Sequence, residues 1–388
     1  MRRKCQPALY LLLLGALLWS FTGDLRARDE KAKGISIGIF RINPSFNMSS
    51  SYSDNILKTS DNRIADKILS FKPVLQITTH WRKLTFSAGY QADVTRHESW
   101  TSEDFADQGL RVNASYEQPN KMKFAIEGAS DWNHDTRGAP DTGFGDIKAP
   151  PKKWRHYSVE TKGEYTLNRF KTLLSTSRDI NDKENVGHYW DKVAFSVMYA
   201  ISPKTSLLTE LSRKSIHYDD ATLKRDSLET GLGAGLTWRA TAQTTGEVRV
   251  GMKAKSLPDK PQSDTSSTTW DGNVVWKPLR HTSVGLNLNR DFQEGGETDL
   301  YFVTTGASLS LEHQVRSFLT QTAKLSYTNN AYASSLENNL WKAGIGVNYQ
   351  FPRWWTMGVD LSHTVQESNR PGSNYDDNAV MVTFKGGM

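Results

Sequence analysis

Residues 69–81 read LSFKPVLQITTHW, and residues 84–94 read LTFSAGYQADV. In the first segment the odd positions are mostly apolar and the even positions mostly polar, whereas in the second the even positions carry the apolar side chains. Arg82 and Lys83 separate the two segments. An alternation of period two puts the apolar side chains on one face of a strand, so these residues predict an antiparallel hairpin with one apolar and one polar face.

The same alternation recurs along nearly the whole chain and predicts an all-β protein. The expected fold is a transmembrane antiparallel up-and-down β-barrel of about 18 strands, an even number within the range of bacterial outer-membrane barrels. The expected strands cover residues 35–52, 69–81, 84–94, 110–116, 122–126, 157–165, 170–174, 193–199, 207–211, 228–238, 248–252, 270–276, 284–288, 303–311, 323–327, 341–349, 357–361 and 380–384.

The expected connections alternate between short and long. Short periplasmic turns and longer extracellular loops are typical of outer-membrane barrels, so both termini of the barrel are expected in the periplasm. Longer stretches rich in Asp, Asn, Gly and Pro lie between the short turns. The short turns are expected at residues 80–83, 118–121, 167–169, 202–205, 239–243, 280–282, 313–317 and 352–354.

Aromatic residues close the apolar face of most strands that run toward a short turn, with Leu311 as the exception. Rings at these positions suit the headgroup level of a bilayer. A water-soluble β-sandwich would also alternate but would not regularly place a ring there, and a propeller would need a repeat of about 40 residues. The predicted belt consists of Trp81, Tyr116, Tyr165, Tyr199, Trp238, Trp276, Tyr349 and Phe384.

The first residues have the pattern of a secretory signal peptide. A basic start at residues 2–4 precedes an apolar run from Ala8 to Leu18, and Leu25-Arg26-Ala27 suits a cleavage site. We therefore expect a signal peptide at residues 1–27 and one barrel domain at residues 28–388. The single cysteine, Cys5, falls in this leader, so a disulfide framework and a thiol nucleophile are not expected in the mature protein.

The charge pattern does not favour nucleic-acid binding. The net charge is +6, but the leader carries four basic residues and Asp24, so its removal leaves about +3. Charges of both signs are interleaved, without a basic run. The mean hydropathy of −0.58 is compatible with a barrel, because only every second strand residue faces lipid.

Catalytic and metal-binding motifs are not apparent in the sequence. The nine histidines include no closely spaced pair, and no G-x-S-x-G motif occurs. We expect neither enzymatic activity nor a cofactor or metal site, although a triad assembled across strands is not excluded by spacing.

Charged side chains at the polar strand positions are the candidate lining of a pore. The simpler interpretation is a ladder of cross-strand ion pairs on a solvated inner wall, and the alternative is a track for a hydrated, perhaps acidic, polymer. The glycines at 231, 233 and 235, like those at 344 and 346, suit either extra room along the wall or a tight bend or close packing of strands. The candidates are Lys72, Arg111, Lys123, Glu127, Lys162, Glu229, Glu247, Arg249, Lys253, Lys324, Lys342 and Asp360.

The longest expected connection, Arg137–Lys153, contains three prolines and three glycines. It is either an exposed loop or a segment that folds inward and narrows the pore, and the sequence leaves both open.

The opening residues contain Pro44, the run Tyr52-Ser53-Asp54-Asn55-Ile56, Asp66 and then Pro73. In this order they resemble the start of the β-barrel porin family that occurs with exopolysaccharide biosynthesis clusters. In that family an opening strand leads to a tyrosine-x-Asp-Asn-aliphatic turn and then to a second strand with a proline. The resemblance implies a conduit for newly made polysaccharide, working with a periplasmic polysaccharide-export protein, and it transfers no catalytic residue. The matching positions, which we interpret as architectural, are Pro44, Tyr52, Asp54, Asn55, Ile56, Asp66 and Pro73.

The chain departs from the usual barrel ending, because Phe384 is followed by four more residues instead of standing last. We interpret the terminal aromatic signal as displaced. A monomeric barrel in the outer membrane of a Gram-negative bacterium is expected. A general diffusion porin, or a barrel that anchors a periplasmic partner, are the alternative functions.

Overall fold

The computed structural model describes residues 34–138, 151–239, 243–296, 299–352 and 354–387. The predicted leader lies outside the described residues, as does most of the predicted 137–153 loop. No helix in the described part of the chain is long and apolar enough to cross a membrane.

The strands are β1 (Ile35–Ile37), β2 (Phe40–Ser53), β3 (Asp66–Trp81), β4 (Leu84–His97), β5 (Phe105–Gln118), β6 (Met122–His134), β7 (Lys153–Leu167), β8 (Phe170–Asp182), β9 (His188–Ser202), β10 (Thr205–Tyr218), β11 (Ser227–Trp238), β12 (Thr244–Ser256), β13 (Thr265–Leu279), β14 (Thr282–Glu294), β15 (Tyr301–Arg316), β16 (Leu319–Tyr332), β17 (Glu337–Gln350), β18 (Trp355–Ser368) and β19 (Tyr375–Gly387).

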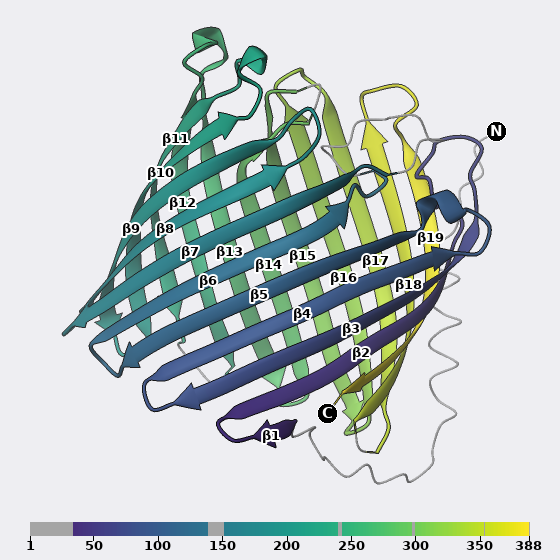
Figure 1. Cartoon of the computed structure of the whole chain (residues 1–388), viewed down its shortest axis with the longest axis horizontal. Helices are drawn as coiled ribbons and strands as arrows, with labels where there is room; N and C mark the ends of the chain where they lie inside the picture. Colours follow the sequence, from purple (N-terminus) through teal and green to yellow (C-terminus); the bar gives the residue numbers. More distant parts are fainter. Residues whose placement is uncertain (1–33, 139–150, 240–242, 297–298, 353, 388) are drawn as a thin grey trace.

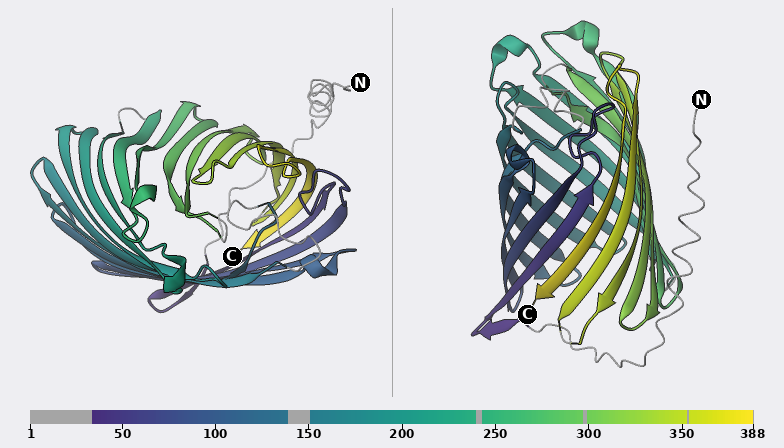
Figure 2. Two further views of the ribbon diagram at one scale, coloured as in Figure 1. Left: turned by 90° about the horizontal axis from the view of Figure 1, so that it is seen from above. Right: turned by 90° about the vertical axis from the view of Figure 1, so that its right-hand side faces the viewer.

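Strands β2 to β19 form one closed antiparallel barrel. Each strand pairs with its neighbours in the sequence, and β19 returns to pair with β2 (Figure 1). The short strand β1 pairs only with β2 and adds no member to the ring. The closed wall is elongated rather than circular in cross-section (Figure 2). The prediction of an 18-strand antiparallel barrel is therefore confirmed.

Short and long connections lie at opposite ends of the barrel, as predicted (Figure 1). Several short turns use a residue with positive φ, including Arg82, Asn120 and Asn168. Asparagine tolerates this left-handed conformation better than most residues, which explains its place there. We call the two ends the short-turn end and the long-loop end; β1 and the last residues of β19 lie at the former.

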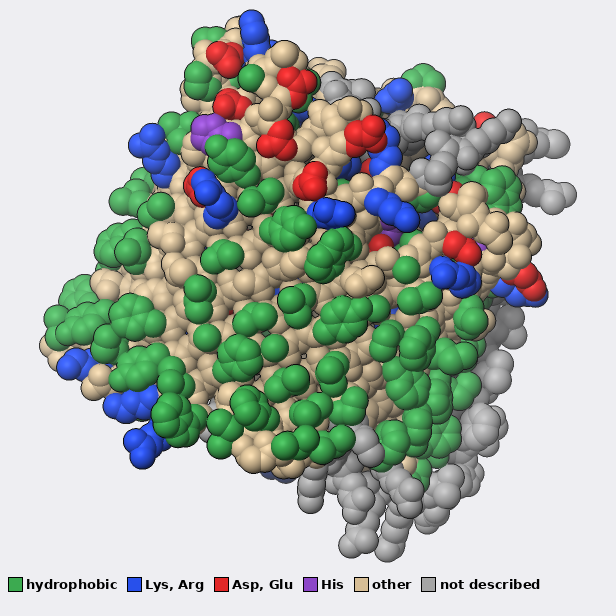
Figure 3. Space-filling model, viewed as in Figure 1, with side chains coloured by type: hydrophobic (Ala, Val, Ile, Leu, Met, Phe, Trp, Pro, Cys, Tyr) green, Lys and Arg blue, Asp and Glu red, His purple; other side chains and the backbone are tan. Residues whose placement is uncertain are grey.

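The outer face of the barrel is apolar over a broad band. Leu232 is 62 % exposed and Trp81 is 56 % exposed, values that would be costly for so many side chains in a water-soluble protein. Apolar side chains cover this band, whereas charged side chains of both signs gather toward the long-loop end and further Lys and Arg side chains lie at the short-turn end (Figure 3). The predicted aromatic positions lie on this face, and Phe384 stacks on Trp355 with ring centroids 5.0 Å apart.

Glycines allow a close approach between β11 and β12. A Cβ atom at Gly235 would lie 2.5 Å from the carbonyl oxygen of Val248, and one at Gly251 would lie 2.5 Å from that of Leu232. A side chain would therefore push the backbones apart. At Gly233 the nearest atom would be 3.6 Å away. Of the two interpretations of this glycine cluster, close strand packing holds for Gly235.

The Asp54-Asn55 pair closes the seam between the first and last barrel strands. The Asp54 carboxylate accepts hydrogen bonds from the backbone and side-chain nitrogens of Asn378 on β19, both at 2.7 Å. Asn55 is fully buried, and its amide donates to the carbonyl oxygens of Thr59 and Asp376 at 2.8 Å. These two residues therefore have the structural role expected of them, because they connect the first and last strands of the barrel.

The other motif residues also have structural positions. Pro73 pairs with Phe46 of β2, and the β3–β4 pairing is interrupted beside it, as the missing N–H requires. Pro44 lies one residue beyond the last β2 residue paired with β19. Tyr52 points outward, and the carboxylate of Asp66 accepts three backbone N–H groups at the start of β3.

Replacement of Asn55 by alanine is expected to weaken the closed barrel. The change leaves two carbonyl groups at the seam without their donor, which costs about 1–3 kcal/mol. The guanidinium midpoint of the refolded barrel should fall for Asn55→Ala and stay near wild type for Asn113→Ala, a half-buried asparagine on β5. Equal midpoints for the two variants would contradict a stabilising role of the seam contacts.

Candidate functional site

The candidate residues lie on the face of the sheet opposite the apolar band. Lys72, for example, follows the exposed Phe71 along β3, so its side chain points to the inside of the barrel. The same alternation places all twelve candidates on the inner face. They are distributed over β3 (Lys72), β5 (Arg111), β6 (Lys123, Glu127), β7 (Lys162), β11 (Glu229), β12 (Glu247, Arg249, Lys253), β16 (Lys324), β17 (Lys342) and β18 (Asp360).

Cross-strand ion pairs run along the inner wall from β3 to β8. Lys72 Nζ lies 2.5 Å from Asp93, and Arg111 lies 2.7 Å from Asp131. Lys162 on β7 lies 4.0 Å from Glu127 across the strand boundary on β6, and 2.8 Å from Glu160 on its own strand. Each pair places opposite charges on the same face of the sheet, as the ladder interpretation requires.

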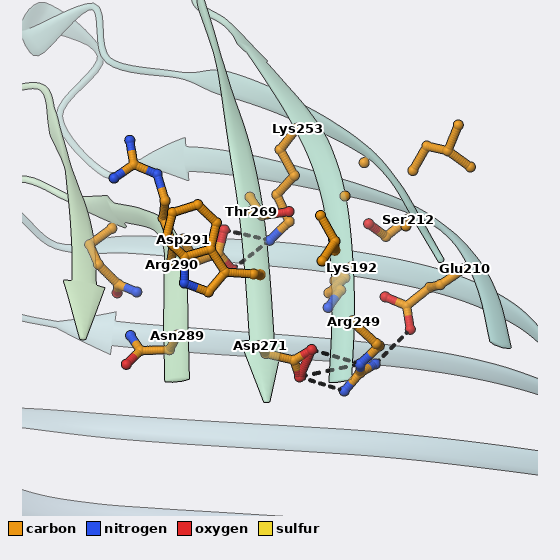
Figure 4. A pocket seen from close by; sticks show the side chains of 17 residues that line it. Lys192, Glu210, Ser212, Arg249, Lys253, Thr269, Asp271, Asn289, Arg290 and Asp291 are labelled. Atoms are coloured by element: carbon orange, nitrogen blue, oxygen red, sulfur yellow. Dashed lines mark hydrogen bonds and ion pairs between the residues drawn. The ribbon is translucent and has the colours of Figure 1, made fainter. Parts of the chain in front are cut away.

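The ladder continues over β9 to β14, where Arg249 contacts three carboxylates. The distances are 3.1 Å to Glu210, 3.1 Å to Glu247 and 2.9 Å to Asp271. Nearby, Lys253 Nζ lies 2.5 Å from Asp291. All of these side chains except Glu247 line a polar groove of about 370 Å³ on the inner wall (Figure 4).

Glu229 is not a solvated pore residue. It is only 4 % exposed, because it belongs to a buried cluster at the long-loop end of the barrel. Lys255, 1 % exposed, lies 3.1 Å from Glu229 and 2.6 Å from Glu294. The hydroxyl of Tyr218 also donates to Glu294 at 2.9 Å. Glu229 thus lies on the inner face, as the alternation predicts, but its carboxylate is buried against Lys255 instead of being exposed to the lumen.

Arg225 fixes one long loop against another beside this cluster. Its guanidinium donates to the carbonyl oxygens of Gly295 and Gly296 at 2.9 Å, and lies 4.6 Å from the ring centroid of Tyr218. The loop between β10 and β11 is thus tied to that between β14 and β15. Sequence reasoning missed Arg225 because loops carry no periodic signal, whereas Lys255 shares the parity of Arg249 and Lys253 and could have been found.

Three of the candidate lysines have no ion-pair partner within the described ranges. Lys324 and Lys342 lie on β16 and β17, and Lys123 lies on β6. Asp360 on β18 is likewise outside the ion-pair ladder as far as the described residues show. The inner wall is therefore asymmetric, with most paired charges on β3 to β14 and few charges on β15 to β18.

The described beginning of the β6–β7 connection reaches toward the seam. Arg137 forms a two-point contact with Glu103, at 2.9 and 2.7 Å. A Cβ atom at Gly138 would lie 3.1 Å from the hydroxyl of Tyr375 on β19. Residues 139–150 of the predicted 137–153 loop, for which an exposed and a pore-narrowing course were both open, lie outside the described residues.

The titratable side chains do not assemble into a metal site in the part of the chain that the structure describes: no three potential ligands come together. His156 contacts Asp179 and Asp131, at 2.6 and 3.2 Å, and forms part of the ion-pair ladder.

The sequence profile of the family described as "Putative beta-barrel porin 2" matches residues 30–386. The chain belongs to this family. A search of curated protein sequences finds no match.

Solved structures with a similar fold include three proteins of Pseudomonas aeruginosa. OccK2 (OpdF) has 8 % identity and a TM-score of 0.50, and the alignment covers 90 % of this chain and 98 % of that one. OpdQ has 10 % identity and a TM-score of 0.48, with 91 % and 100 % covered. OpdK, solved with vanillate, has 10 % identity and a TM-score of 0.48, with 89 % and 99 % covered. At these identities the similarity to OccK2 concerns the fold alone.

Neutralising Arg249 should make the barrel more cation-selective. Arg249→Gln leaves three carboxylates without their shared counter-charge, so the local potential becomes more negative. A change of about 1 kT in this potential alters the local concentration of a monovalent ion about threefold. The reversal potential in a KCl gradient measures this change. Lys253→Gln is the control, because it frees only Asp291 and should shift selectivity less. An unchanged reversal potential in Arg249→Gln would show that this groove does not border the ion path.

Proposed function

We propose that this porin-family barrel secretes an exopolysaccharide of the capsule or biofilm type across the outer membrane of a Gram-negative bacterium. The observation that carries the proposal is the inner wall, whose charges neutralise one another in pairs. Such a wall offers water and polar groups to a hydrated chain without a strong field of one sign that would hold it. The opening-hairpin resemblance supplies the link to polysaccharide.

The size of the barrel supports a conduit. Barrels of 16 to 18 strands leave an aqueous channel, whereas barrels of about eight strands are filled by side chains. In the expected orientation the short turns face the periplasm and the long loops face outside. Arg225, in a long loop, and Lys255, at the long-loop end of β12, then lie on the outer side. In this role the chain acts as a channel and not as an enzyme.

A general diffusion porin is the second candidate, and the family description favours it. The two functions differ in what is lost without the protein: a diffusion porin supplies small solutes, whereas a secretion barrel releases a polymer made inside the cell.

Deletion of the gene should move the polysaccharide from the cell surface to the periplasm. If the barrel provides the outer-membrane step, synthesis continues for a time and the polymer accumulates beneath the membrane. Surface and periplasmic polymer are measured separately, and complementation with the wild-type gene is the control. Unchanged surface polymer in a strain that makes one would refute the secretion role and leave the diffusion porin.

A periplasmic polysaccharide-export protein is the proposed partner, and the short turns are where it would dock. A photo-crosslinking residue in place of Lys83, in the β3–β4 turn, should capture this protein, identified by mass spectrometry. The same residue in place of Thr222, in the β10–β11 connection at the other end, is the matched control. Crosslinking that is equal at both positions, or absent at Lys83, would argue against the partner.

A further inference from the structure

We propose that the inner wall formed by β13 to β18 is a binding surface for uncharged, hydroxyl-rich saccharide. The inference rests on the proposed function and narrows its substrate class: the transported polymer is neutral rather than acidic. Three observations support it. Amide and hydroxyl side chains form a continuous row across the wall, neighbouring polar side chains lie flat over glycines, and the positive and negative charges on β15 to β18 are equal in number.

A single row of inward-facing polar side chains crosses this wall. The strand register aligns Asn273 with Asn287, Asn287 with Ser308, Ser308 with Ser326, Ser326 with Lys342, and Lys342 with Thr364. Asn273 donates to the side-chain oxygen of Asn287, and Asn287 donates to Ser308 at 3.4 Å. Five of these six side chains are uncharged, and each amide or hydroxyl can both donate and accept hydrogen bonds, as a sugar hydroxyl does.

Glycines let neighbouring polar side chains lie flat against the same wall. A Cβ atom at Gly285 would lie 2.6 Å from the Ser310 hydroxyl, and one at Gly306 would collide with the Asn289 amide. The side chains of Ser310 and Asn289 therefore occupy the space that a larger residue would need. The result is a surface of amides and hydroxyls close to the level of the backbone, suited to a ligand that slides along it.

The charges that remain on this wall do not favour an acidic ligand. Lys324 and Lys342 stand near each other, since Lys324 pairs with Gly344 and Lys342 with Ser326. Glu312 and Asp360 lie on the adjacent row toward the short-turn end, where they align with Thr322 and Gly346. On β15 to β18 these two cations and two anions leave no net charge to attract a carboxylated chain, and Asp271 and Asp291 on β13 and β14 are engaged with Arg249 and Lys253. On β3 to β12, by contrast, most charged groups are already engaged with each other.

Cysteine protection tests this surface directly. In a Cys5→Ser background, Ser326→Cys places a thiol on the proposed surface, and Ser158→Cys places one on the charged wall, in a groove lined by Arg111, Glu127 and Glu160. Both serines are half-buried and inward-facing. The rate of modification by a water-soluble methanethiosulfonate is measured in the full barrel, with maltoheptaose as the neutral probe and oligogalacturonate as the acidic one.

We expect maltoheptaose to slow modification at Ser326→Cys about threefold at a concentration of twice its Kd, because protection scales as one plus the ratio of ligand to Kd. Ser158→Cys should be unaffected, and oligogalacturonate should protect less. An unreactive Ser326→Cys, equal protection at both sites, or stronger protection by oligogalacturonate would overturn the inference. Any of these results can coexist with loss of surface polymer on gene deletion, so the secretion role and the neutral-ligand inference fail separately.

Discussion

The pairing of β2 with β19 is the contact on which the rest of the structure depends. A sheet with an apolar outer face leaves unpaired N–H and C=O groups at its two edges, and in hydrocarbon each such group costs several kcal/mol. The pairing from Ser53–Ala379 to Ser45–Gly387 removes both edges. Asp54 and Asn55 then extend this contact beyond the ends of the strands, through Asn378 and Asp376.

Closure separates two environments along every strand. Because side chains alternate along a strand, the residues between the apolar ones point into the barrel. There lysine and arginine side chains pair with carboxylates across strands. Arg249 with its three carboxylates and Lys253 with Asp291 are the densest part of this network. The wall from β13 to β18 is different in kind, since amides and hydroxyls replace most of the ion pairs.

The period-two pattern was sufficient to predict the strands, the alternation of turn lengths and the inward set, because each depends on neighbours in sequence. It could not predict the burial of Glu229 beside Lys255, nor the contacts by which Arg225 ties two loops together. Nor could it reveal the seam contacts. Ser53 and Asp377, which share a hydrogen bond there, are 324 residues apart, and only the closed ring brings them together.

A disulfide across the seam tests the closed barrel most directly. Ser51 and Met381 are partners in the β2–β19 register and face the same side of the sheet. In a Cys5→Ser background, Ser51→Cys with Met381→Cys should form the bond on mild oxidation of the membrane-inserted chain, seen as a shift in gel mobility that reductant reverses. Ser51→Cys with Thr383→Cys, two residues out of register, should not. Failure of the first pair, or preferential bonding of the second, would contradict the seam and the closed barrel built on it.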